Sequence, residues 1–440
     1  NADEIAAWAT GESVRSLLNL EPEKRTATQK ERLLRHYLQS SDKDRFGMYQ
    51  RDRSTAAAVV EEEKRLPTSM VMRERAEKRK TFILTRGQYD QPTEAVEPAV
   101  PAALAGQGGD PAPTPQDRLE FARWLVNPRQ ALSSRVIVNR IWGTIFGTGL
   151  VKTTGDLGVQ GEYPSHPELL DELALDFVES GWDMKSLVRE IVTSATYRQQ
   201  STVTPANSRR DPDNRMLARG PRFRLDAESI RDQALSVSGL LTNIMGGPSV
   251  RPYQPPGLWE AVSYDGGQSY VPSEGGDLYR RGLYTFWKRQ SPPPGFLVWD
   301  GPTRETCVVN RSRTNTPLQA LVLTNDITFV EAARVWGGRL LREAASGSPP
   351  PPMNQVVARA FRQLTCRLPD SEESRLFETL YHELLTEFQS HPEAATRLLR
   401  VGAAPPVRHV NGSEIESAEW AALTTVLQVM LNLDEAVTKE

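Results

Sequence analysis

The fold class of this chain is decided by residues 166–181, HPELLDELALDFVESG. Apolar residues recur there at three- and four-residue spacing, which is the pattern of a helix with one buried face. Pro167 lies in the first turn, where its missing N–H costs nothing, and Gly181 follows the last turn. This stretch therefore predicts an amphipathic helix that packs against other helices.

Similar helical patterns occur through most of the remaining sequence, with no internal repeat. They cover the ranges 13–20, 28–38, 54–64, 118–126, 133–147, 185–198, 225–241, 316–344, 354–365, 371–388 and 418–437. The stretch KTFILTRG at 80–87 is instead rich in strand formers. We therefore predict a mainly α protein, a helical bundle-like domain with long ordered loops, plus a short β or extended segment near residues 69–100.

Proline, glycine and alanine mark the expected domain boundaries. Residues 102–116 and 346–354 have the composition of linkers. We expect a helical arm with short strands at 1–101. A main helical domain would follow at 117–345, with C-terminal helices at 355–440 packing on it. The chain starts at Asn1 without a signal-peptide pattern, so we expect a C-terminal piece of a larger protein.

Composition excludes several classes of protein. The 440 residues carry 53 basic and 56 acidic side chains, so the net charge of −3 does not indicate a nucleic-acid partner. Hydrophobic residues at 38% and charged residues at 25% argue against a disordered, collagen-like or coiled-coil chain. No apolar run approaches the ~18–20 residues of a membrane span, so none is predicted.

The two cysteines, Cys307 and Cys366, are too few for a disulfide-rich scaffold or a four-cysteine zinc site. Whether they pair stays open. No C-x-x-C-H occurs, so no c-type haem is expected in this chain, and no metal site is predicted. The motifs of P-loops, dinucleotide folds, serine hydrolases and zinc proteases are also absent from the sequence.

The glycine-rich loop at 153–166 holds the first candidate site. Asp156 and His166 could bind a metal or carry out acid–base chemistry. The alternative is that Asp156 caps a turn and that Ser165 or His166 caps the following helix. No second histidine lies at ligand spacing, which argues against zinc.

Arginines gather in the second and third candidates. RGPRFRLDAESIRD at 219–232 contains Arg231 among interleaved carboxylates, which fits either a buried ion-pair network or a cradle for anionic groups. DGPTRETCVVNRSRTNTPLQALVLTN at 300–325 follows. It combines Asp300, Arg304, Arg311, Arg313 and Gln319. Thr316 and Pro317 have the pattern of a helix start. An arginine-lined pocket at that helix start would suit an anion. A nucleophilic role for Cys307 would need a nearby base, and none is close in the sequence.

The aromatic loop PYQPPGLWEAVSYDGGQSY at 252–270 is the fourth candidate. Trp259 and Tyr264 lie among proline and glycine, as rings that stack on sugars or partner proteins often do. Filling of the core by the same rings explains the pattern equally well. Asp265 offers a single carboxylate, which is too few for a calcium site.

Several long stretches resemble the planctomycete surface domain family, a domain of unknown function. They include RVIVNRIWGTIFGTGLVKTTGDLGVQGEYPSHPELLDELALDFVESGWDMKSLVREIVTSATYR (135–198), RGPRFRLDAESIRDQALSVSGLL (219–241), YRRGLYTFWKRQSPPP (279–294), the 300–325 run and LNLDEAVTKE (431–440). The resemblance covers roughly residues 117–440. It adds Arg140 to the candidate ligand-binding residues. It supplies no catalytic residue.

The resemblance also implies a context. By this resemblance, full-length members look like large secreted proteins that carry a c-type cytochrome domain and a companion domain ahead of this one. Residues 1–101 would then be the C-terminal remnant of that companion domain. We therefore expect an extracytoplasmic location: periplasmic, cell-surface or secreted. Any c-type haem would lie in a partner or a preceding domain.

Three functional hypotheses follow. The first is a non-catalytic binding or scaffold module of a cytochrome-associated protein or complex, with the companion domain or other chains as partners. The second is a hydrolase or lyase acting on anionic polysaccharide, sulfated or uronic. The catalytic candidates would then be Asp156, His166 and Asp300. The third is an accessory subunit of an electron-transfer complex with haem in partner chains.

Overall fold

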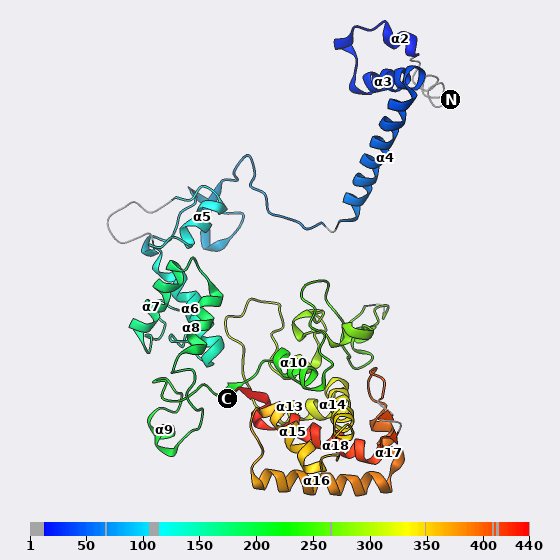
Figure 1. The fold of residues 1–440 in the computed structure, drawn as a ribbon. Helices are drawn as coiled ribbons and strands as arrows, with labels where there is room; N and C mark the ends of the chain where they lie inside the picture. Colours follow the sequence, from blue (N-terminus) through cyan, green and yellow to red (C-terminus); the bar gives the residue numbers. More distant parts are fainter. Residues whose placement is uncertain are drawn as a thin grey trace. The chain divides into compact units, whose positions relative to one another are not determined.

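The computed structural model describes residues 13–66, 68–104, 114–264, 266–347, 349–406, 409–410 and 413–439. The protein is mainly helical, which confirms the predicted fold class, and its strands form short antiparallel pairs (Figure 1). The chain divides into two compact units, Asn1–Val96 and Glu97–Glu440. Within the described ranges, no helix is both long enough and apolar enough to cross a membrane.

Between residues 13 and 96, leaving out residue 67, the structure describes α-helices, short 3-10 helices and a β-hairpin in the first unit. Its elements are α2 (Val14–Leu18), η1 (Pro22–Lys24), α3 (Ala27–Ser41), α4 (Lys43–Arg65), β1 (Thr81–Leu84), η2 (Thr85–Gly87) and β2 (Pro92–Val96). α4 is longer than the helix predicted at 54–64. Its first half lacks an apolar stripe, and its start is fixed by Asp42, whose side chain accepts a hydrogen bond from the Arg45 amide at 3.0 Å.

A small helical group opens the second unit. It contains η3 (Ala102–Leu104), α5 (Arg118–Leu125), α6 (Ala131–Phe146), α7 (Pro167–Glu179), α8 (Met184–Thr193) and α9 (Pro205–Arg210). The apolar stripe of α7, including Leu173 and Phe177, is buried in a cluster with Val138 and Trp142 of α6 and Ile191 of α8. The amphipathic pattern at 166–181 therefore forms a helix whose apolar side faces the core.

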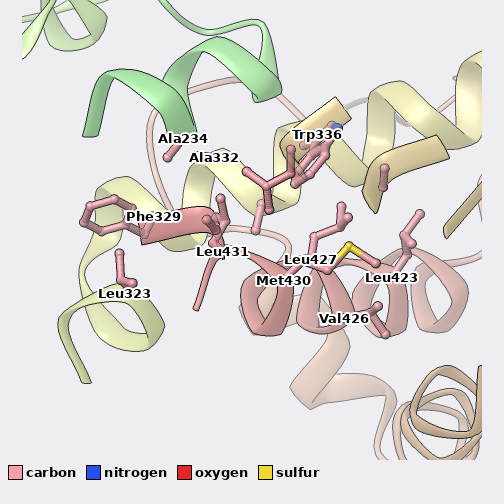
Figure 2. Close-up of a cluster of buried hydrophobic side chains, with 14 of the residues drawn as sticks. Ala234, Leu323, Phe329, Ala332, Trp336, Leu423, Val426, Leu427, Met430 and Leu431 are labelled. Carbon is pink, nitrogen blue, oxygen red and sulfur yellow. The ribbon is translucent and has the colours of Figure 1, made fainter. Parts of the chain in front are cut away.

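The larger core is formed by α10 (Ala227–Ser238), α13 (Pro317–Asn325), α14 (Ile327–Ala345), α15 (Met353–Thr365) and α18 (Ser417–Leu431). Figure 2 shows Trp336 of α14 beside Leu427 and Met430 of α18, and all three side chains are fully buried. Each such side chain stabilises the fold by roughly 1.5–3 kcal/mol. α18 is apolar around most of its circumference because α14, α16 and α17 all pack against it.

Glycine allows α14 and α18 to approach closely. A Cβ atom at Gly338 would lie 2.9 Å from the ring of Trp420. The indole nitrogen of Trp420 also donates to the carbonyl of Arg334 at 2.8 Å. This contact links α18 directly to the backbone of α14, and a larger residue at position 338 would separate the two helices.

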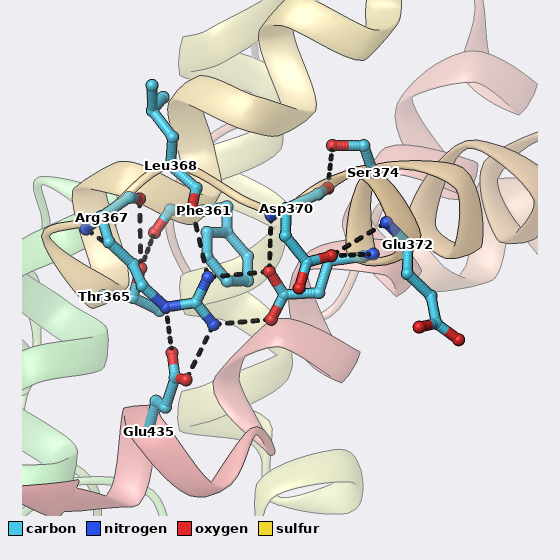
Figure 3. A network of polar contacts seen from close by, with 9 residues as sticks. Phe361, Thr365, Arg367, Leu368, Asp370, Glu372, Ser374 and Glu435 are labelled. Carbon is cyan, nitrogen blue, oxygen red and sulfur yellow. Dashed lines mark hydrogen bonds and ion pairs between the residues drawn. The ribbon is translucent and has the colours of Figure 1, made fainter. Parts of the chain in front are cut away.

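The C-terminal part adds α16 (Ser371–Ser390), α17 (Pro392–Leu398) and α19 (Asp434–Val437). Arg367, between α15 and α16, connects these elements (Figure 3). Its guanidinium donates to Glu373 of α16 at 2.6 and 2.7 Å. It also donates to Glu435 of α19 at 2.7 and 3.1 Å. The guanidinium lies 4.7 Å from the ring centroid of Phe361.

Long irregular segments connect the helices between residues 239 and 316. Their short elements are α11 (Leu258–Ala261), η4 (Gly275–Tyr279), η5 (Gly282–Tyr284) and α12 (Pro294–Val298). Two-residue strands pair β3 (Phe223–Arg224) with β6 (Thr438–Lys439) and β4 (His409–Val410) with β5 (Ser413–Glu414). Both cysteines, Cys307 and Cys366, are free and exposed, which settles the pairing that the sequence left open.

Candidate functional site

A cavity of about 360 Å³ lies where α10, α12, α13 and the start of α14 meet the loop at 252–255. The fold builds it from proline and aromatic residues. Prolines 293 and 294 start α12, and the chain then places Phe296 and Trp299 in the wall. Phe329, in the first turn of α14, closes another side. The cavity is therefore mainly apolar.

Arg231 of α10 is the charged group buried in this wall, with only 4% of its surface exposed. Its two terminal nitrogens donate to the backbone carbonyls of Arg280 at 2.6 Å and Leu278 at 2.8 Å. Burial lowers the pKa of the Arg231 guanidinium, although the charge of Asp232 opposes this shift. Asp232 itself pairs with Arg281 at 2.9 Å.

Other polar groups of the cavity wall are also incompletely bonded. Four side chains have a buried polar atom without a hydrogen bond to any described residue: Nε of Arg231, Oε1 of Gln254, Oγ1 of Thr285 and Nε1 of Trp299. The carboxylate of Asp326 is engaged, because it caps α14 by accepting from the Thr328 amide at 2.8 Å. Unbonded buried polar atoms are uncommon in folded proteins, so this wall is unusual.

The aromatic loop packs beside this cavity. Trp259 is 7% exposed, lies edge-on to Tyr270 at 5.2 Å between ring centroids, and has the Lys288 ammonium 4.4 Å from its ring. Burial raises the pKa of Tyr270 to about 12, although the charge of Arg251 opposes the shift. Tyr264 is fully exposed. The predicted binding loop therefore has one ring in the interior and one in solvent.

Asp300 and Gln319 hold the start of α13 in place. Asp300 accepts hydrogen bonds from the amide and hydroxyl of Thr314, at 2.7 and 2.9 Å. Gln319 forms a capping box with Thr316 and also donates to Thr314 Oγ1 and Val298 O, both at 3.1 Å. The predicted helix start at Thr316 and Pro317 is confirmed. Asp300 thus acts on the backbone of the segment that leads into α13.

Asp156 and His166 make local contacts in the loop between α6 and α7. Asp156 Oδ1 accepts from the Gly158 amide at 2.7 Å, so it caps a turn. The Nδ1 atom of His166 lies 3.1 Å from Ser165 Oγ, and His166 is the N-cap residue of α7 without a side-chain capping bond. Neither residue lines the cavity around Arg231, nor does Asp300.

Three other arginines predicted to bind a ligand, Arg311, Arg304 and Arg140, do not line the cavity around Arg231. Arg311 makes a bidentate pair with Glu228 at 2.7 and 3.1 Å. Arg304 is exposed, with its guanidinium 4.5 Å from the Trp287 ring centroid. Arg140 is exposed on α6. The ligand-binding candidates therefore do not form one cluster around the cavity, where Arg231 is the member of the set that lines the wall.

Arg313 belongs to a second cavity, of about 320 Å³, at the C-terminal end of α6. It donates to the carbonyl of Gly147 at 2.8 Å, and Lys439 donates to that of Ile145 at 2.8 Å. Cations are favourable at a helix C-terminus. Gly147 has φ +83°, and a Cβ atom there would lie 2.7 Å from the ring of Phe223. The tight approach explains why glycine ends α6.

Several residues of the larger cavity were not singled out from the sequence, among them Phe296, Trp299, Asp326 and Phe329. The feature of the sequence that could have indicated this cavity is the run PPPGFLVW at 292–299, where aromatic residues follow prolines. Within the described parts of the chain, no group of three or more histidine, cysteine, aspartate or glutamate side chains is placed to hold a metal ion.

Comparison with known proteins identifies a family without assigning a function. A search of curated proteins and a search of solved structures both found no match. The family described as PSD1, Protein of unknown function (DUF1553), matches residues 117–381. This region includes the larger cavity and both arginine-rich segments, and it is more than half of the chain. The chain therefore belongs to the PSD1 (DUF1553) family.

Proposed function

We propose that this chain is a non-catalytic binding or scaffold module whose N-terminal unit docks on another protein chain. One observation carries the proposal. Among the described residues of this unit, the buried apolar side chains are those of Leu17 and Leu38. α4 contains no buried residue along its whole length, from Lys43 to Arg65. Helices in proteins draw most of their stability from packing, so this unit needs a surface to pack on.

The hairpin supports the same proposal. Every residue of β1 and β2 is exposed, although β1 includes Phe82, Ile83 and Leu84. A two-stranded hairpin is marginally stable by itself, and its open edges can pair with a strand of another chain. Just before it, Met70 to Met72 expose three further apolar side chains. A partner that covers these two segments would bury their exposed apolar side chains.

The catalytic candidates give less support to an enzyme. Asp156, His166 and Asp300 each make local contacts, with Gly158, Ser165 and Thr314 respectively. A glycosidase needs two carboxylates facing each other across a groove, about 5–10 Å apart. Resemblance alone suggests that the partner is a c-type cytochrome chain or companion domain outside the cytoplasm, and we include this context in the proposal.

Site-specific photo-crosslinking in the native host would test the docking role. A photoreactive amino acid at Ile83, 48% exposed in the hairpin, should give one saturable adduct with a defined partner protein. The same amino acid at Leu368, 63% exposed between α15 and α16, should give none. Excess unmodified chain should compete for the adduct.

Hydrogen exchange provides the second measurement. In the isolated protein, the amides of α4 should exchange close to the rate of an unstructured peptide, and the partner should protect them. Strong protection of α4 without a partner would contradict the proposal. So would equal crosslinking yields at positions 83 and 368.

A further inference from the structure

We propose that the cavity around Arg231 binds a small carboxylate with an aromatic or aliphatic body. This inference goes beyond the docking role and does not depend on it, because it rests on a different part of the chain. The cavity volume of about 360 Å³ falls within the range of small-molecule sites, roughly 300–1,000 Å³. Such sites are mainly apolar and carry a few polar groups that orient the ligand.

The guanidinium of Arg231 determines the charge of the ligand. Among the described residues, no carboxylate lies within ion-pair distance of this guanidinium, although only 4% of the Arg231 surface is exposed. A buried charge is costly unless it is paired. The two nearby carboxylates are engaged elsewhere, Asp232 with Arg281 and Asp326 with the start of α14. A ligand carboxylate would supply the missing negative charge.

Most of the polar atoms in the wall that lack a hydrogen bond are donors, which favours a ligand that accepts hydrogen bonds. Arg231 Nε and Trp299 Nε1 are donors, and Thr285 Oγ1 can donate. Arg231 and Thr285 are each 4% exposed and Trp299 is 6% exposed, so water has little access to these groups. Gln254 Oε1 can only accept, so a carboxylate would not bond it.

The apolar wall determines the rest of the ligand. Phe296, Trp299 and Phe329 surround the space, together with the prolines that start α12. A phosphate or sulfate ester of a sugar would leave its hydroxyl groups against these apolar surfaces without partners. A single guanidinium also matches the single charge of a carboxylate. These features favour a compact apolar acid over a polar anion.

Binding of phenylacetate and phenylacetamide, measured by calorimetry on the full chain, tests the proposal. The two probes have similar shape and differ in charge. Phenylacetate should bind at least about tenfold more tightly than the amide, because its negative charge would pair with the buried guanidinium of Arg231 and the amide has no charge. Equal affinity, or no binding of phenylacetate, would overturn the proposal.

Two variants locate the binding. Leu321 lines the cavity and is 55% exposed, so Leu321→Trp should fill the mouth and weaken phenylacetate binding at least about tenfold without disturbing the core. Leu376 on α16 is also 55% exposed and lies outside the cavity lining, so Leu376→Trp should bind like the wild type. Unchanged binding by Leu321→Trp would place phenylacetate elsewhere and refute the inference.

Discussion

Arg231 and Arg367 lie in two regions of the same unit and differ both in exposure and in the kind of group that their guanidinium bonds. The side chain of Arg367 is 41% exposed, yet it bonds two carboxylates, those of Glu373 and Glu435 (Figure 3). Arg231 is 4% exposed and bonds only two backbone carbonyls. The region around Arg367 thus neutralises a charge that water could solvate. The cavity region leaves uncompensated a charge that water cannot reach.

A third arginine offers the strongest way to test this comparison. Arg334 of α14 is 1% exposed, like Arg231, but Glu331 lies 3.6 Å from its guanidinium. Glu331→Gln removes that charge and leaves Arg334 buried without a carboxylate. We expect the variant to lose about 3–5 kcal/mol of unfolding free energy, the usual cost of breaking a buried pair. Urea denaturation followed by circular dichroism measures the change.

Glu343 provides the matched control on the same helix. Its side chain is 34% exposed and lies 2.6 Å from Arg359 and 3.7 Å from Arg339. Glu343→Gln should cost about 1 kcal/mol or less, because water can solvate the arginines that remain. Equal losses of unfolding free energy for the two variants would show that burial of an arginine does not set how much a carboxylate partner stabilises it. The buried Arg231 would then need no carboxylate partner.

Removal of the Arg367 guanidinium should have an intermediate effect. Arg367→Met eliminates the bidentate contacts to Glu373 and Glu435 that join α16 to α19. Both carboxylates are partly exposed and can be hydrated, so we expect a loss of about 1–2 kcal/mol by the same denaturation assay. Arg359→Met removes one exposed pair and should cost roughly 0.5 kcal/mol or less. A larger loss for Arg359→Met would contradict the role given to the Arg367 network.

Helix positions were largely predictable from the sequence because burial on one face leaves a periodic pattern. α7 and α18 bury the apolar residues that this pattern marked. α4 was predicted too short, since no face of it is buried and its start depends on the cap at Asp42. The packing of α14 on α18 requires contacts between residues 334 and 420, and spacing along one helix contains no information about such pairs.

The site was less predictable because similar arginine-rich segments have different surroundings. Arg231 and Arg311 both came from clusters with interleaved acids. Arg311 reaches Glu228 from a distant segment, whereas Arg231 donates to the carbonyls of Leu278, in η4, and Arg280, just after it. Which acid meets which arginine depends on long-range chain paths. Residues from four helices line the cavity. The sequence shows its aromatic residues, but it does not show that these helices bring them to one place.

The smallest expected effect concerns pH and Glu373. Hydrogen bonds from Arg367 hold the pKa of the Glu373 carboxyl below its ordinary value of about 4.3. Folding therefore favours the ionised form. The stabilisation is complete above that ordinary value and is lost as pH falls through the lower, folded-state pKa. Denaturation curves between about pH 6 and pH 3 should show a shallower acid loss for Arg367→Met than for wild type.

The pKa of the Glu419 carboxyl is shifted in the opposite direction from that of Glu373, so its effect on stability should depend on pH in the opposite way. Burial raises the pKa of this carboxyl in the folded protein, and the charge of Glu416 adds to the shift. Its stabilising contribution is complete below about 4.3 and is lost as pH rises through the folded-state pKa. Glu419→Gln should therefore make stability fall less as pH rises from about 5 to 7, whereas Arg367→Met should change the pH dependence mainly below about pH 5. If both variants altered the same pH interval, the pKa of the Glu373 carboxyl and that of the Glu419 carboxyl would not be shifted in opposite directions.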